Sequence, residues 1–66
     1  MDKKEFEKSF EALKKSHKII RIELNNTDCI YAISYEDAIF AEYSVWLTWR
    51  GHKIALVEYS HIDHLE

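Results

Sequence analysis

The sequence predicts an α+β domain in which one N-terminal amphipathic helix is followed by about five antiparallel strands. Three observations lead to this fold class. Apolar residues near the N-terminus recur at helical spacing, later segments alternate apolar and polar residues, and residues 38–50 are rich in β-branched and aromatic side chains without Pro or Gly. We expect the strands to form a strongly bent sheet or a small barrel that the helix covers.

The chain of 66 residues is short enough to form one domain over residues 1–66. Its final Leu65-Glu66 resembles the linker that precedes a polyhistidine tag. A hydrophobic content of 47% favours a well-filled core, and the single Cys excludes an internal disulfide. Small chains without a disulfide or a structural metal often gain stability by association, so we expect a homo-oligomer.

Targeting signals and membrane spans are absent from the sequence pattern. The longest apolar run is only a few residues, and no basic segment precedes an apolar one. These observations predict a cytoplasmic protein with no membrane partner. The formal net charge of −3 disfavours nonspecific binding to phosphate backbones, although it allows a local basic patch.

The helix is predicted over about residues 3–16. Asp2 can accept hydrogen bonds from the first-turn amides, and Phe6, Phe10 and Leu13 follow at positions that share one helix face. Cations cluster at its end, where they suit the negative pole of the helix dipole; they are Lys14, Lys15, His17 and Lys18. The alternative interpretation of this cluster is a basic spot that contacts an anionic partner such as nucleic acid.

Two strands are predicted next, over residues 18–24 and 29–35. In the first, Ile20, Ile22 and Leu24 alternate with charged residues, which is typical of a half-buried strand. Residues 25–28, Asn-Asn-Thr-Asp, favour a chain reversal between the two. The second strand has apolar residues on both faces, so which face is buried stays open.

Residues 38–50 predict one long strand after a polar break at Glu36-Asp37. At about 3.3 Å per residue it would span roughly 43 Å, so we expect it to bend near residues 42–44 and to be shared between two short sheets. Its second face leaves Phe40 and Trp46 in need of cover from the helix or another subunit. The predicted core face consists of Ile39, Ala41, Tyr43, Val45, Leu47 and Trp49.

The remaining chain predicts a hairpin and a short final strand. Gly51, the only Gly, marks the hairpin turn after Arg50. A strand over residues 53–59 follows, and a turn at Ser60 leads into a last strand over residues 61–65.

This order of elements resembles the Sm-like family of LSm and Hfq type. Residues 20–26 are similar to the family's strand that ends in an Asn-Gly turn, residues 36–40 look like its Asp-centred turn, and Tyr59-Ser60-His61 looks like the Tyr-Lys-His of the bacterial RNA chaperone. The resemblance implies an SH3/Sm-like barrel that forms rings through its fourth and fifth strands. It also implies RNA sites along the pore of that ring.

The sequence favours a non-enzymatic interaction module that self-associates through sheet edges or an aromatic face, or that binds another protein. Aromatic residues near polar neighbours are typical of subunit interfaces. The candidate interface residues are Phe40, Trp46 and Tyr59. Edge strands without Pro or Lys would also favour association.

RNA binding of Sm-like type is the first alternative. Arg50 and Lys53 lie close in sequence to aromatic residues that could stack on bases. The resemblance adds Tyr59 and His61 to this set. RNA would then be the partner.

A small metal-binding regulator is the second alternative, built on His61 and His64. Side chains three residues apart on a strand point to opposite faces, so the two imidazoles converge only if this segment is a turn or a helix. The main interpretation is a solvated terminus without a metal.

Enzymatic chemistry has no supporting motif. The sequence contains no Gly-x-Ser-x-Gly elbow, phosphate loop or dinucleotide fingerprint. Cys29 is typical of a small buried apolar residue, and the adjacent Glu36-Asp37 side chains diverge, which makes them a poor acid–base pair. We therefore predict no catalytic residue and no cofactor.

Overall fold

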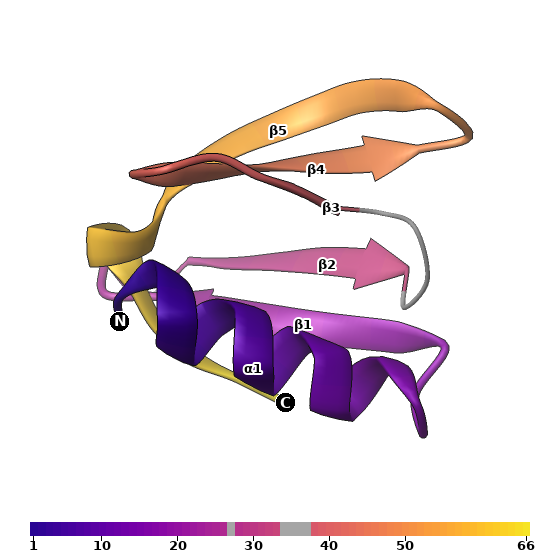
Figure 1. Ribbon diagram of the computed structural model, residues 1–66, viewed down its shortest axis with the longest axis horizontal. Helices are drawn as coiled ribbons and strands as arrows, with labels where there is room; N and C mark the ends of the chain where they lie inside the picture. Colours follow the sequence, from indigo (N-terminus) through magenta and orange to yellow (C-terminus); the bar gives the residue numbers. More distant parts are fainter. Residues whose placement is uncertain (27, 34–37) are drawn as a thin grey trace.

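The computed structural model describes residues 1–26, 28–33 and 38–66 of the chain (Figure 1). The predicted end of the second strand at Tyr35 and the break at Glu36-Asp37 lie outside the described residues. The elements are α1 (Lys3–Lys14), β1 (Ile19–Leu24), β2 (Cys29–Ile33), β3 (Ala38–Phe40), β4 (Ser44–Trp49), β5 (His52–Glu58), the 3₁₀ turn η1 (Tyr59–His61) and β6 (Ile62–Leu65).

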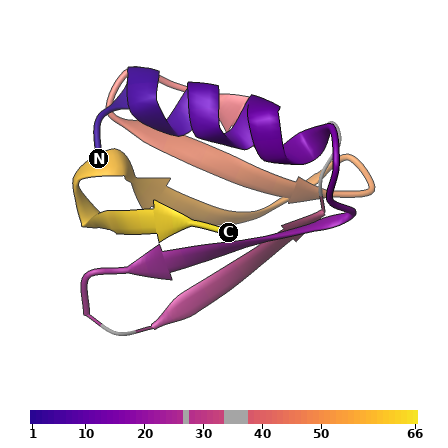
Figure 2. The same ribbon diagram turned by 90° about the horizontal axis from the view of Figure 1, so that it is seen from below.

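The six described strands form two antiparallel three-stranded sheets, with strand orders β2-β1-β6 and β3-β4-β5. The sheets are stacked in two layers, and α1 lies beside β1 and β6 (Figures 1 and 2). The predicted α+β class, with one N-terminal helix followed by antiparallel strands, is confirmed; the structure describes six strands where about five were predicted. Within the described residues no helix has the length and apolar character needed to cross a bilayer.

The single long strand predicted over residues 38–50 is wrong. β3 and β4 pair antiparallel, so the chain reverses between Phe40 and Ser44 instead of bending. The amide of Ala41 donates a 2.9 Å hydrogen bond to the carbonyl oxygen of Ser44, which closes this turn. A straight strand of roughly 43 Å could not fit into a molecule whose longest extent is 25 Å.

The reversal also changes which side chains face the core. Val45 and Leu47 are buried as predicted, but the rest of the predicted core face is exposed: Ile39, Ala41, Tyr43 and Trp49. Two irregularities break the two-residue alternation. One is the turn after Phe40, and the other is a register shift between Leu47 and Thr48 that leaves Thr48 buried.

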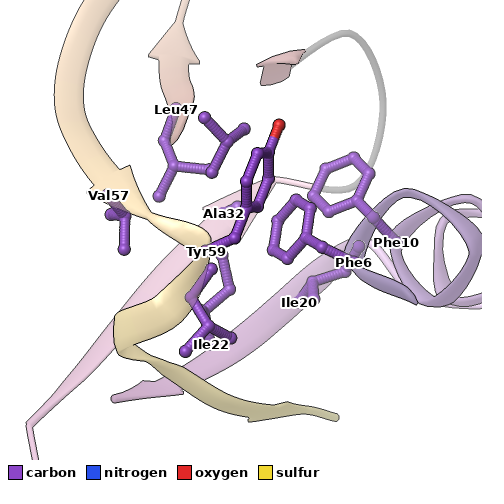
Figure 3. Close-up of a cluster of buried hydrophobic side chains, with 10 residues drawn as sticks. Phe6, Phe10, Ile20, Ile22, Ala32, Leu47, Val57 and Tyr59 are labelled. Carbon is purple, nitrogen blue, oxygen red and sulfur yellow. The ribbon is translucent and has the colours of Figure 1, made fainter. Parts of the chain in front are cut away.

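α1 contributes two aromatic rings to the core. The Asp2 carboxylate accepts a 2.8 Å hydrogen bond from the Glu5 amide, so the helix begins where the capping pattern predicts. Phe6 and Phe10 are fully buried, and their ring centroids lie 5.7 Å apart (Figure 3). They meet side chains from both sheets in one cluster, with Ile20, Ile22, Ala32, Val45, Leu47, Val57, Tyr59 and Ile62.

The C-terminal third of the chain connects the two sheets. Arg50 and Gly51 both have positive φ, 50° and 81°, which is typical of a two-residue hairpin turn, and the hairpin predicted at Gly51 is confirmed. After β5, η1 carries the chain to the other sheet, where β6 pairs with β1. The predicted turn at Ser60 is therefore the crossing point between the sheets.

Candidate interaction surface

An apolar row crosses the outer face of sheet β3-β4-β5. The strand register places Ile39 beside Trp46 and Trp46 beside Leu56, so one side chain from each strand forms the row. Ile39 is 49% exposed and Leu56 52%, while Trp46 is half-buried. These exposed fractions show that the row faces solvent. Figure 1 shows β3, β4 and β5 in the layer farther from α1.

Ile54 extends this row along β5. Its neighbour Ala55 pairs with the inward-facing Leu47, so strand alternation directs Ile54 outward, and its side chain is 57% exposed. We call the set Ile39, Trp46, Ile54 and Leu56 the outer apolar patch. Contiguous apolar surface of this kind is typical of binding sites.

Two opposite charges on β5 flank the patch. The ammonium group of Lys53 lies 5.0 Å from the centroid of the Trp46 ring, a cation–π contact on the outer face. Glu58 pairs with Ser44 at the other end of the strand, and its side chain is exposed. The patch therefore has a cation toward the β4–β5 turn and an anion toward η1.

The structure separates the three predicted interface residues. Trp46 lies on the surface in the outer apolar patch. Phe40 instead points inward, where its ring centroid lies 5.8 Å from those of both Phe6 and Phe10. Of the two kinds of cover predicted for Phe40, the helix or another subunit, the helix supplies it, so Phe40 is a core residue and not an interface residue.

Tyr59 is also a core residue, with a side chain only 3% exposed. Its hydroxyl donates a 2.8 Å hydrogen bond to the Ala41 carbonyl oxygen. Burial raises the pKa of Tyr59, and the carboxylate of Glu7 raises it further. This side chain is therefore not available for a surface contact, either with another subunit or with RNA.

The other predicted RNA-binding residues are exposed. The guanidinium of Arg50 lies 5.5 Å from the Trp49 ring centroid, and Lys53 lies over Trp46 on the same hairpin. His61 is placed apart from them in η1, where its Nε2 lies 3.4 Å from a carboxylate oxygen of Glu58. Two cation–aromatic pairs thus share the β4–β5 hairpin.

The predicted metal-binding pair does not form a cluster of its own. His64 Nε2 lies 3.4 Å from Glu23 Oε2 and 3.8 Å from Glu66 Oε2. Within the part of the chain that the structure describes, Glu23, His64 and Glu66 are the group whose donor atoms lie within 4.8 Å of one another. His61 is not a member, because it contacts Glu58 instead.

The two carboxylates of this group already have a cationic partner in Arg21. Its guanidinium nitrogens lie 2.9 Å from Glu23 Oε1 and 3.3 Å from Glu66 Oε1, and the Glu23 carboxylate raises the pKa of Arg21. The pairing of β1 with β6 and the backbone hydrogen bonds between Arg21 and Glu66 bring these residues together. Their wide separation in sequence gives no local signal, so sequence analysis did not find the group.

Comparison with known proteins gives no match. Neither protein-family models, nor curated proteins, nor solved structures match this chain.

Proposed function

We propose that this protein is a non-enzymatic interaction module that self-associates through the outer apolar patch. The observation that carries the proposal is the Ile39–Trp46–Leu56 row, which crosses a whole sheet on its solvent side. Covering apolar surface yields about 25 cal/mol per Å² removed from water. A chain of 66 residues has a small core and gains proportionally more from such burial.

A second copy of the same chain is the occupant that we propose for the patch. Most soluble oligomers are symmetric, and a twofold interface needs a surface that is complementary to itself. The patch has this property, because Trp46 is central and has an aliphatic residue on each side, Ile39 and Leu56. The other sheet is less suitable, since its strands carry the charged group around Arg21 and Glu23.

The experiment that tests self-association is light scattering over a concentration series. We expect an oligomer for the unaltered chain and a monomer for Leu56→Lys and for Trp46→Lys, because either change places a charge in apolar surface that the interface buries. The matched control is Tyr31→Lys, which introduces the same charge at a side chain 59% exposed on the other sheet. Circular dichroism verifies that each variant is folded.

Two results would contradict this proposal. One is a monomeric unaltered chain at every concentration. The other is an oligomer whose mass does not change in either patch variant, since the contact would then lie elsewhere.

RNA binding of Sm-like type is the second candidate function. The observation that favours it is the pair of cation–aromatic contacts on the β4–β5 hairpin, Arg50 with Trp49 and Lys53 with Trp46. Aromatic rings beside cations are typical of surfaces that bind single-stranded nucleic acid, where bases stack and phosphates pair with the cations. Trp49 is 42% exposed and could accept a base.

Fluorescence anisotropy with a labelled single-stranded RNA tests this second candidate. We expect affinity to fall with rising salt and to be lost in the double variant Arg50→Glu/Lys53→Glu. A control double variant, Lys4→Glu/Lys8→Glu, makes the same change in net charge on exposed positions of α1. Equal losses in both double variants, or binding that does not depend on salt, would count against a hairpin site.

A further inference from the structure

We propose that two copies pack face to face about a twofold axis parallel to the Ile39–Trp46–Leu56 row, so that Lys53 of each copy lies opposite Glu58 of the other. This inference rests on the proposed self-association and specifies its geometry. It goes further because it assigns the two charges on β5 a role in orienting the partner.

The two charged residues lie on opposite sides of the row in the strand register. Lys53 pairs with Thr48 and Glu58 pairs with Ser44. The cation–π contact with Trp46 places Lys53 on the outer face. Ser44, the partner of Glu58, is two residues from Trp46 on β4, so Glu58 lies on that face as well, and the backbone positions of Lys53 and Glu58 lie on either side of Trp46. At about 3.3 Å per residue each is displaced along the strands by roughly 7 Å.

Both side chains are available for a contact between copies. Within the described residues, Lys53 has the Trp46 ring as its neighbour and makes no ion pair, while the carboxylate of Glu58 contacts His61 at 3.4 Å. Lys53 and Glu58 are exposed. A contact across the interface would give Lys53 an anionic partner and Glu58 a cationic partner.

The symmetry of a twofold axis determines which charges meet. An axis parallel to the row keeps Trp46 over Trp46 and Leu56 over Leu56, while it reverses the direction along the strands. Lys53 of one copy then faces Glu58 of the second copy, and the same contact is repeated on the other side. An axis parallel to the strands would instead place Glu58 opposite the turn at Ala41 of the second copy, which offers no cation.

Charge reversal tests this geometry. We compare the dimer dissociation constants of the unaltered chain, Lys53→Glu, Glu58→Lys and the double variant Lys53→Glu/Glu58→Lys by analytical ultracentrifugation. Each single change places like charges together at both contacts, so we expect dimerisation to weaken at least about tenfold. The double variant restores opposite charges, and we expect its dissociation constant to return to within about threefold of the original.

Mixing provides a second and stronger test. When Lys53→Glu chains are mixed with Glu58→Lys chains, every introduced charge meets an opposite charge on the other chain. We therefore expect the two single variants, each weakly associating alone, to form a heterodimer at least about tenfold more stable than either homodimer, with a preference that falls as salt rises. Lys8→Glu on α1 is the control for altered net charge.

The outcomes distinguish this inference from the proposal on which it rests. The twofold geometry is overturned, and self-association stands, if Leu56→Lys abolishes the dimer while the single charge reversals leave its dissociation constant unchanged. The same conclusion follows if Leu56→Lys abolishes the dimer and the double variant fails to recover the original dissociation constant. A monomeric unaltered chain overturns both. Glu58→Lys does not alter the Trp46 contact of Lys53, so it provides a measure independent of any local change that Lys53→Glu causes.

Discussion

The hydroxyl of Tyr59 donates a 2.8 Å hydrogen bond to the carbonyl oxygen of Ala41. This contact joins the first residue of η1 to the turn between β3 and β4, and the Tyr59 amide donates a second bond of 3.1 Å to the Tyr43 carbonyl oxygen of the same turn. Tyr59 therefore connects η1, where the chain passes from one sheet to the other, to the turn between β3 and β4.

Removal of this hydroxyl should destabilise the fold without altering its core volume. We expect Tyr59→Phe to lower the free energy of unfolding by about 1 kcal/mol, the usual contribution of one intramolecular hydrogen bond. Urea denaturation followed by circular dichroism measures this change. The control Tyr31→Phe removes a hydroxyl from an exposed ring and should leave stability within about 0.5 kcal/mol. A Tyr59→Phe variant as stable as the unaltered chain would show that the bond contributes nothing.

Stability should also fall at alkaline pH because of Tyr59. Burial, assisted by Glu7, raises its pKa above the ordinary value of 10.0. The unfolded chain then loses this proton more readily than the folded one, so the stabilisation is fully present below the unfolded pKa and is lost as pH rises through the interval between the two pKa values.

The comparison of the unaltered chain with Tyr59→Phe isolates this contribution. We expect the difference between their free energies of unfolding to be constant below pH about 9 and to shrink above pH about 10. Urea denaturation at a series of pH values measures it. A difference that stays constant up to pH about 11 would contradict a raised pKa.

Truncation of the aromatic core should be the most damaging single change. Phe10 is 1% exposed and packs against both Phe6 and Phe40. We expect Phe10→Ala to cost about 3–5 kcal/mol, which is comparable with the whole stability of a small domain. Thermal denaturation measures the loss, and Lys8→Ala, at an exposed position two residues away on α1, is the control. A loss below about 1 kcal/mol would mean that the ring is not packed as the structure describes.

The β4–β5 turn requires Gly51 for its backbone conformation and not for want of space. Its φ is +81°, and an added Cβ would have no heavy atom within 4 Å. We expect Gly51→Ala to cost about 1 kcal/mol from backbone strain without a steric clash. Gly51→Asn should cost less, because Asn tolerates this conformation better. Chemical denaturation of both variants measures the order, and equal losses would argue against strain as the cause.

The sequence by itself determined the local elements, because each depends on neighbouring residues. Asp2 and the spacing of Phe6 and Phe10 predicted the helix and its buried face. The alternation around Ile20 and Ile22 predicted β1. Gly51 predicted the hairpin, because positive φ is a property of the single residue.

Only the tertiary structure decided how residues 38–50 divide. No Gly or Pro marks the reversal after Phe40, and it is stabilised by distant contacts, among them the Tyr59 hydroxyl on the Ala41 carbonyl oxygen. Once the chain reverses there, Phe40 turns inward and Ile39 joins Trp46 on the outer face.

The candidate sites were likewise determined partly by the sequence and partly by the tertiary structure. Trp46 could be chosen from sequence, because an aromatic residue on the less apolar face of a strand is unusual there. The rest of the outer apolar patch could not, since Ile39, Trp46 and Leu56 come together only through strand pairing. Arg21, Glu23 and Glu66 meet for the same reason. Conformations set by a residue's own backbone can be predicted from the sequence, whereas surfaces assembled from separate strands depend on a register that long-range packing determines.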